Sequence, residues 1–313
     1  MGRGRKSGLK LNGWIILDKP LEMTSTSAVN KVRYLLNANK AGHGGTLDPL
    51  ATGILPIALG EATKTINHIQ DGQKTYHFTV TWGQATDTDD AEGDVIETHD
   101  HRPVEKDIIA ILPEFTGLIE QVPPKFSAIK INGERAYDLA RAGKHVEMKS
   151  RSAMIFDIQL IKHNDDTATF EVHCGKGTYM RSLARDIALK LGTVGHVTYL
   201  RRLKVGVFDE NMSISLDDLE KRVQDAPADT ILHPVETALD DIPDLALTPA
   251  EAARLRNGQT IQFISRADIA RLHKAGIETP ANDCTALAKS DGTPIAVIAV
   301  TGVEIRPVRV LNL

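Results

Sequence analysis

One aspartate in a glycine-rich segment has the setting of a reactive carboxylate. The segment GHGGTLDPLATG spans residues 42–53 and holds Asp48 directly before Pro49. Proline biases the preceding residue toward extended backbone and glycines let the chain turn tightly, so the pattern predicts a loop that presents the carboxylate. An ionised carboxylate can serve as a nucleophile or as a base. Most Asp-Pro pairs only start turns, so this signal alone favours a structural role.

Three other side chains could take part in chemistry, and each also has an ordinary explanation. His43 lies in the same loop, where a histidine often only caps a turn or forms a hydrogen bond. Tyr76 lies in an alternating apolar segment, which favours a place in the core. Arg181 lies in an amphipathic helical pattern, where a charge usually faces solvent. Spacing alone does not connect these residues with Asp48.

The common cofactor and metal motifs are missing from the sequence. No Gly-Lys-Ser/Thr follows the glycine-rich loop, which argues against a P-loop, and no G-x-G-x-x-G opens a helix after a strand. The eleven histidines form no HxxxH pair, and Cys174 and Cys284 form no CxxC pair. The acidic stretch 87–90 lacks the ligand spacing of a calcium loop, so a solvated loop is predicted there.

Hydrophobic periodicity predicts mixed strands and helices around these candidates. Strands are predicted at 13–20, 54–60, 74–83, 126–133, 154–163, 167–175, 195–208, 286–300 and 304–313. Helices are predicted at 27–37, 62–72, 104–113, 134–143, 175–192 and in the first part of 250–263. The segment 41–53 is predicted to be a loop without regular structure, and an Asp-Gly turn is expected within 286–300. The fold class that follows is α+β, with a mainly antiparallel core.

A proline-rich acidic stretch at 225–249 predicts a domain boundary near residue 245. A length of 313 residues and 42% hydrophobic residues suit two domains with buried cores. The sequence contains no run of about 18 apolar residues, which a membrane-spanning helix would need. The two distant cysteines suit a reducing cytoplasm, which is the expected location.

Charge is segregated along the chain. The net charge of −4 argues at first against a nucleic-acid partner. Residues 1–50 and 121–210 nevertheless carry an excess of Lys and Arg, whereas 51–120 and 211–250 are acidic. Since the local field of one face steers a polyanion, this distribution permits RNA binding. Exposed helix faces without any partner would give the same pattern.

The motifs, taken in order, resemble the TruB family, the bacterial tRNA pseudouridine-55 synthases. GWIILDKP resembles the first motif of the family, and GHGGTLDPLATG resembles its catalytic loop. KTYHFTVTWGQATDTDDAEG, CGKGTYMRSLARDIALKLG and YLRRLKVGVF resemble the strand, helix and last-strand motifs. QVPPKFSAIKINGERAYDLARAG resembles the segment that closes over the RNA as a thumb. The similarity runs nearly from end to end, although 264–284 is longer than expected for a compact PUA connection.

The resemblance implies a domain organisation and a set of site residues. Residues 1–245 would form a pseudouridine synthase domain with a thumb at about 123–152, and 246–313 a small PUA-like β domain. The catalytic residues implied are Asp48, Tyr76 and Arg181. The residues implied to bind the substrate are His43, Tyr179, Leu200, Lys19 and Pro20. The implied partner is the T-stem-loop of tRNA, for a monomer that needs no guide RNA, cofactor or metal.

The implied chemistry leads to two hypotheses about side chains. Asp48 must be ionised to react, and burial opposes ionisation, so we expect Arg181 to contact the carboxylate. Tyr76 is a candidate for the base that removes the C5 proton of the uracil. Whether Asp48 attacks C1′, attacks C6 or abstracts a proton stays open.

Three other interpretations stay open from the sequence. The chain could bind or fold RNA without catalysis, or work within a guide-RNA particle as dyskerin-like enzymes do. A nucleotide-binding enzyme is a third alternative, which rests on the glycine-rich loop.

Overall fold

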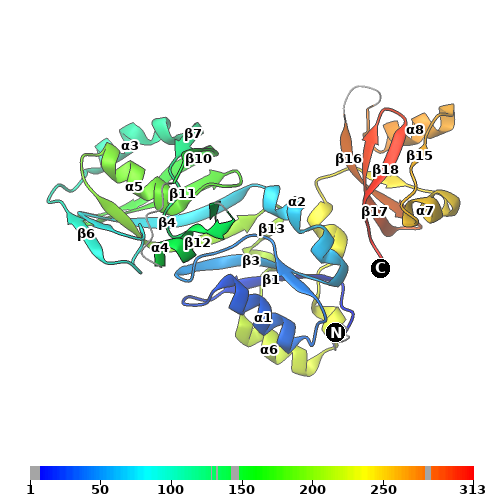
Figure 1. Ribbon diagram of the computed structural model, residues 1–313, viewed down its shortest axis with the longest axis horizontal. Helices are drawn as coiled ribbons and strands as arrows, with labels where there is room; N and C mark the ends of the chain where they lie inside the picture. Colours follow the sequence, from blue (N-terminus) through cyan, green and yellow to red (C-terminus); the bar gives the residue numbers. More distant parts are fainter. Residues whose placement is uncertain (1–7, 128, 132, 142–147, 279–282) are drawn as a thin grey trace.

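The structure is a computed structural model that describes residues 8–127, 129–131, 133–141, 148–278 and 283–313. A nine-stranded sheet and a five-stranded sheet dominate these residues (Figure 1). The main path of the larger sheet runs β1-β3-β12-β4-β11-β10-β7, with β2 beside β3 and β13 beside β12. Its strands are β1 (Gly13–Lys19), β2 (Ala41–His43), β3 (Ala51–Leu59), β4 (Lys74–Trp82), β7 (Gly117–Gln121), β10 (Arg151–His163), β11 (Thr167–Cys174), β12 (Gly195–Val205) and β13 (Phe208–Asp209).

Strand pairing in the larger sheet is antiparallel except between β12 and β3. In that parallel pair, Leu200 lies opposite Ala51 and Arg202 lies opposite Gly53. On its other edge β12 pairs with β4, where Arg202 lies opposite Tyr76. The predicted α+β class with a mainly antiparallel core is therefore confirmed, and β12 lies at the junction of the two halves of the sheet.

Helices cover the two halves of this sheet separately. Apolar residues of α3 and α5 pack against β4, β10 and β11, around Phe78 and Phe170. Apolar residues of α1 and α6 pack against β1 and β3, around Leu17 and Leu55. The helices are α1 (Ser25–Leu35), α2 (Ile66–Asp71), α3 (Glu105–Ile111), α4 (Ala136–Arg141), α5 (Met180–Lys190), α6 (Leu216–Asp225), α7 (Pro249–Arg256) and α8 (Arg266–Lys274). Short 3₁₀ turns include η1 (Gly60–Lys64) and η2 (Leu112–Phe115).

Two hairpins project from the larger sheet. The first consists of β5 (Gln84–Thr86) and β6 (Val95–Thr98). The second consists of β8 (Lys130–Ile131) and β9 (Glu134–Arg135), followed by α4. The second hairpin lies within the thumb predicted at about 123–152, of which residues 128, 132 and 142–147 lie outside the described residues. The thumb therefore stays a prediction.

The five-stranded sheet runs β14-β16-β17-β18-β15. Its strands are β14 (Asp244–Ala246), β15 (Ile261–Gln262), β16 (Cys284–Ser290), β17 (Thr293–Thr301) and β18 (Glu304–Val310). The predicted Asp-Gly turn joins β16 to β17, and both Asp291 and Gly292 have positive φ, as a tight hairpin requires. A PUA-like assignment is compatible with this small sheet. The division into 1–245 and 246–313 stays a prediction.

The unexpectedly long segment 264–284 contains α8. Its helix begins with a capping box, in which Ser265 and Asp268 each accept a hydrogen bond from the backbone of the other. The Arg271 side chain of α8 lies over the Phe263 ring, with the guanidinium carbon 4.4 Å from the ring centroid. An added helix thus accounts for the extra length.

The two sheets meet through a shared apolar cluster and through the end of the chain. Leu287 and Val297 of the smaller sheet pack in the same cluster as Trp14 and Phe208 of the larger one. The Asn312 amide donates to Glu61 Oε2 at 2.7 Å, in the turn that follows β3.

Three local predictions were wrong in part. Of the described residues in the strand predicted at 126–133, Lys130–Ile131 form a strand, β8. Ala41–His43 form a short strand instead of a loop, because their backbone pairs with Leu59–Ile57 of β3. The helix predicted at 175–192 begins only at Met180, because Gly177 has φ +80° and Tyr179 is extended. Its predicted end is right, since α5 stops at Lys190 and Gly192 has φ +72°.

Candidate active site

The loop that carries Asp48 joins β2 to β3, and we call residues 44–50 the aspartate loop. Its ends are held by backbone bonds from Gly44 to the Pro56 carbonyl at 2.8 Å and from Ala51 to the Asp48 carbonyl at 3.1 Å. In the middle, the buried Ser25 hydroxyl accepts a bond from the Leu47 amide at 2.8 Å and donates to the Leu47 carbonyl at 2.9 Å. The residue next to Asp48 is therefore fixed on both sides of its α-carbon.

Two buried cations complete the support of the aspartate loop. Lys19, at the end of β1, donates to the carbonyls of Pro20 at 2.9 Å, Met23 at 2.7 Å and Pro49 at 3.3 Å. Arg202 of β12 donates to the carbonyls of Ile54, Thr46 and Gly45, at 2.8, 3.4 and 3.1 Å. Burial lowers the pKa of Lys19 to about 8, partly offset by the nearby Asp48 charge. These side chains fix the backbone on both sides of the carboxylate.

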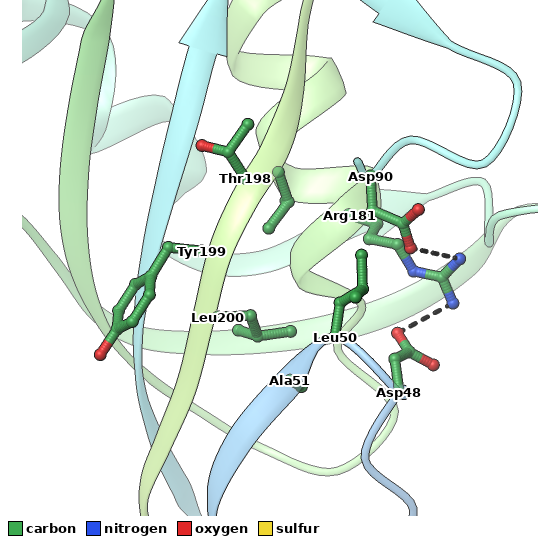
Figure 2. Close-up of a pocket in the computed structure, with 9 residues that line it drawn as sticks. Asp48, Leu50, Ala51, Asp90, Arg181, Thr198, Tyr199 and Leu200 are labelled. Atoms are coloured by element: carbon green, nitrogen blue, oxygen red, sulfur yellow. Dashed lines mark ion pairs between the residues drawn. The ribbon is translucent and has the colours of Figure 1, made fainter. Parts of the chain in front are cut away.

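Arg181, in the first turn of α5, joins two carboxylates. Its Nη2 lies 3.0 Å from Asp48 Oδ2, and its Nη1 lies 3.5 Å from Asp90 Oδ2. Figure 2 shows the guanidinium between the two acids. The predicted contact between Asp48 and Arg181 is confirmed. The ordinary alternative, in which the Arg181 charge faces solvent, is excluded, since only 6% of the residue is exposed.

The carbonyls of Thr88 and Phe126 take the remaining bonds of the Arg181 guanidinium, at 3.1 and 2.9 Å. A buried arginine needs such partners, because its donors would otherwise lose their hydration without replacement. The Phe126 contact links the site directly to the beginning of the predicted thumb.

The acidic stretch predicted to be solvated is largely part of the site. Asp87 is exposed, but Asp90 and Thr88 are buried. Asp90 Oδ1 accepts bonds from Thr88 Oγ1 at 2.6 Å and from the Glu92 amide at 3.0 Å. The prediction failed for Asp90 because its partner, Arg181, is ninety-one positions further along the chain and comes into reach only through the fold.

A pocket that is partly open to solvent lies beside the Asp48 carboxylate. One wall is apolar, and the polar wall is the ion-paired group of Asp48, Arg181 and Asp90 (Figure 2). The residues that line the pocket are Asp48, Leu50, Ala51, Asp90, Arg181, Val197, Thr198, Tyr199 and Leu200. An apolar recess with a few convergent polar groups is the usual form of a small-molecule or base-binding site.

The surroundings of Asp48 shift its ionisation. Its side chain keeps 37% of its surface exposed at the pocket. The surrounding protein nevertheless raises the pKa of Asp48 by desolvation, and the Arg181 charge opposes that rise. Asp90 adds to the rise because it is a second negative charge nearby. Arg181 is thus the main group that favours the ionised form of Asp48, and the Lys19 charge acts in the same direction.

Among the other predicted site residues, Leu200 lines the pocket, whereas Tyr76 and Tyr179 do not. Tyr76 lies on β4 and packs against the same apolar clusters as Leu200. Desolvation raises the pKa of the Tyr76 hydroxyl, and the Arg202 charge opposes the rise. Tyr179 immediately precedes α5, and desolvation also raises the pKa of its hydroxyl.

His43 and Lys19 contact the backbone of the aspartate loop, and Pro20 follows Lys19 in the chain. The Nδ1 atom of His43 accepts a long bond of 3.4 Å from the Gly45 amide, and desolvation followed by the Arg202 charge lowers the pKa of His43. Lys19 is fully buried and its bonds go to backbone, whereas Pro20 is exposed. Direct contact of these residues with a substrate stays a prediction.

Sequence reasoning missed Asp90 and Arg202. A signal for Arg202 is present in the strand YLRRLKV, because consecutive residues of a strand face opposite sides. One of the two adjacent arginines must therefore face inward. Arg201 takes the outer side and binds Asp18 with both Nη atoms at 2.9 Å, while Arg202 is 1% exposed.

Within the described residues, no group of three or more His, Cys, Asp or Glu side chains is arranged to hold a metal ion. Over the same residues, no helix is both long enough and apolar enough to cross a membrane.

Comparison with known proteins identifies the family. The family model described as TruB family pseudouridylate synthase, N-terminal domain, matches residues 33–180. A second one, described as the C-terminal domain of tRNA pseudouridylate synthase B, matches residues 181–240. The tRNA pseudouridine synthase B of Rhodospirillum rubrum is 50% identical over 314 residues, which covers 99% of each chain. That of Caulobacter vibrioides is 48% identical over 310 residues, with the same coverage.

Solved structures share the fold. A structure of an H/ACA RNP bound to a substrate RNA containing 2′-deoxyuridine superposes with a TM-score of 0.73 at 22% identity, covering 100% of this chain and 92% of that one. A Cbf5-Nop10-Gar1 complex superposes with a TM-score of 0.71 at 26% identity, covering 95% and 84%. The fold and the family models together define a pseudouridylate synthase. The chain belongs to the TruB family.

Proposed function

We propose that this chain converts the T-loop uridine at position 55 of tRNA to pseudouridine, with Asp48 as the catalytic carboxylate. The observation that carries the proposal is the Asp48–Arg181 pair at 3.0 Å beside a pocket with an apolar wall. In this family reaction the N1–C1′ bond breaks, C5 bonds to C1′, and the proton of C5 is replaced by one on N1. The net change is an isomerisation.

The pocket suits a base that has left its stack. A stacked base cannot turn, so the nucleotide must be flipped, at a cost of a few kcal/mol. Leu200, Leu50 and Ala51 offer an apolar surface to the uracil, and Asp48 is at the edge of the same recess. Arg181 holds the carboxylate and favours its ionised form, and Asp90 holds Arg181 from the other side.

Tyr76 is proposed to contact the flipped base. Its raised pKa keeps the phenol protonated at neutral pH, so Tyr76 can take the C5 proton only if its own proton leaves. Tyr76→Phe separates these roles, because full turnover by this variant would remove Tyr76 as the base. A loss of turnover with unchanged tRNA affinity would support a role in proton transfer.

The substrate assignment rests on relatives and on charge. The relatives from Rhodospirillum rubrum and Caulobacter vibrioides carry the name tRNA pseudouridine synthase B. The excess of Lys and Arg in 121–210 and 1–50 would hold phosphates, and tRNA affinity would then fall steeply with salt. The proposal includes action as a monomer in the cytoplasm, without guide RNA. A salt-independent affinity would contradict the assignment of these segments.

The test is a site-mapped modification assay on unmodified tRNA transcript, with the purified chain and no other macromolecule. Wild type is compared with Asp48→Asn and with Asp166→Asn, which changes a surface carboxylate that pairs with Arg102. A second transcript carries cytidine at position 55. We expect pseudouridine at position 55 from wild type and Asp166→Asn, and none from Asp48→Asn or on the second transcript.

Other outcomes assign the function differently. Modification of another uridine would show that the substrate is a different position of the tRNA. Tight tRNA binding without modification by wild type would favour an RNA-folding or guide-dependent protein. Turnover by Asp48→Asn would remove the carboxylate from the chemistry.

A further inference from the structure

Two arginines on α5 face one loop, residues 86–92, which we call the acidic loop. Arg181 and Arg185 are one helical turn apart, so they lie on the same side of the helix. Arg181 pairs with Asp90, and Arg185 pairs with Asp89 at 2.9 Å between Nη1 and Oδ2. The Asp89 and Arg185 side chains are only 16% and 26% exposed, so solvent and salt screen this pair less than a surface pair.

The backbone of Asp89 has a conformation that needs support. Its φ is +60°, in the left-handed region that side chains other than glycine rarely adopt, although aspartate tolerates it better than most. The Asp89 amide donates to the Thr86 carbonyl at 3.2 Å, and the Asp89 carbonyl accepts from the Val197 amide at 3.0 Å. The loop is thereby tied to β12 at the pocket wall.

The turn at Asp89 decides where the next side chain points. Asp90 follows directly, and it reaches Arg181 with one oxygen while its other oxygen accepts bonds from Thr88 and Glu92. If the backbone of Asp89 relaxed to a negative φ, Asp90 would leave this position. Arg181 would then lose one of the two acids that fix it beside Asp48.

Arg185 holds Asp89 in place and connects it to a second segment. Its Nη2 donates to the Val122 carbonyl at 2.8 Å, just before the predicted thumb, and its Nε donates to Asp186 at 3.0 Å. Ser182 Oγ donates to the same Val122 carbonyl at 2.8 Å. The guanidinium is thus fixed on three sides and cannot follow a movement of the loop.

We propose that Arg185 is a positioning residue for pseudouridine formation, which acts through Asp89 to hold Asp90 against Arg181. The proposal rests on the proposed function, because it assumes that Arg181 and Asp48 act on a uridine. Arg185 itself does not line the pocket and is assigned no contact with substrate.

The experiment measures single-turnover modification of tRNA transcript and tRNA affinity. The variants are Arg185→Gln, Asp89→Asn, both together, and the conservative Arg185→Lys. Asparagine also tolerates the left-handed region, so Asp89→Asn removes the charge without changing the backbone preference. Asp186→Asn is the matched control, because it removes the charge of an acid that pairs with Arg185 outside the acidic loop.

We expect Arg185→Gln and Asp89→Asn each to be roughly tenfold slower, with affinity changed less than about twofold, because small misplacements of a catalytic group are costly. The double variant should be no slower than these single variants, because each of them already removes the Arg185–Asp89 interaction. Arg185→Lys should recover most of the rate, and Asp186→Asn should keep it. The proposal would be overturned if the rates were unchanged, or if the losses of rate in the two single variants multiplied in the double variant. It would also be overturned if weaker tRNA binding explained the slower reaction.

Hydrogen exchange provides a readout that needs no activity. The Glu92 amide donates to Asp90, so its exchange should accelerate in Arg185→Gln and not in Asp186→Asn. If wild type formed no pseudouridine while this exchange changed as expected, the proposed function would fail and the positioning would stand. Unchanged Glu92 exchange would overturn the positioning itself.

Discussion

The two sheets of the molecule differ in what they bury. The nine-stranded sheet and its loops bury Lys19, Lys74, Arg181 and Arg202, and they bury Asp90 as well. Within the described part of the five-stranded sheet, the buried polar side chain is Ser290, in a core of Leu, Ile, Val, Phe and Ala. Charges in the smaller unit, such as the Arg271–Glu251 pair, stay partly exposed.

This difference is consistent with the proposed location of the chemistry in the larger sheet. A buried charge is costly unless it is paired, and an apolar replacement is often more stable. The smaller sheet follows that rule, because its core consists of apolar side chains. The larger sheet departs from it at the aspartate loop and the acidic loop, where each buried cation bonds a backbone carbonyl or a carboxylate. We therefore expect substitutions of the buried charges in the larger unit to lower the rate of modification. Substitutions in the smaller unit should lower stability and leave the rate nearly unchanged.

The largest effect on rate is expected for Arg181→Met. Asp48 and Asp90 would face each other without a cation, and breaking a buried pair costs about 3–5 kcal/mol. Single-turnover modification should fall at least 100-fold, on the order of that energy. The matched change in the other unit, Arg271→Met, should cost below about 1 kcal/mol and leave the rate unchanged. Equal losses of rate in both variants would break the comparison.

Arg202→Met should have the next largest effect. It removes the bonds to three carbonyls of the aspartate loop and its exit, of which the bond to Ile54 is buried and the bonds to Thr46 and Gly45 are partly buried. The loss of stability should be about 3 kcal/mol, and modification should slow by roughly 10- to 100-fold. Urea unfolding and single-turnover assays measure the two quantities. A stable variant with wild-type rate would show that the loop keeps its shape without Arg202.

Ser25→Ala should have a smaller effect through the same loop. The Leu47 amide and carbonyl lose their partner, at about 1–3 kcal/mol, and modification should slow by roughly tenfold. Thr24→Ala is the control, because it removes the helix cap of α1 at about 1 kcal/mol without touching Leu47. If both variants slowed the reaction alike, helix stability rather than loop position would be the cause.

The smallest effect on rate is expected for Ile298→Ala in the smaller sheet. This fully buried side chain would leave a cavity and cost about 2–5 kcal/mol of stability. At a temperature where the variant is folded, single-turnover modification should stay within about twofold of wild type. A strong loss of rate in the folded variant would show that the apolar unit also positions the site.

The sequence predicts most of the fold because periodicity is a local signal. The strands at β1, β3, β4 and β12 and the helix α5 follow from alternating or helical apolar patterns. The short strand β2 was missed because three residues are too few to show an alternating apolar pattern, and its pairing with β3 depends on the fold. The start of α5 was misplaced because glycine in 175–179 adopts a backbone that a pattern of side chains does not record.

Residues of the site could be predicted only where they belong to a motif that resembles the family. The motif resemblance placed Asp48 and Arg181 together, and the structure confirms their contact. Asp90 and Arg202 were missed, because a charge in a polar loop or strand resembles any surface charge until its partner is known. Their partners come from α5 and from the aspartate loop, which lie far from them along the chain.

The pH dependence of single-turnover modification tests most directly whether Arg181 keeps Asp48 ionised. The surroundings raise the pKa of Asp48 and Arg181 opposes that rise, so the rate should fall as the pH decreases through this raised pKa. Rates are measured from about pH 5 to about pH 9 for wild type and Arg181→Met. We predict that the acidic limb moves to higher pH in Arg181→Met, with part of the rate restored in alkaline solution. An acidic limb at the same pH in both proteins would contradict the account.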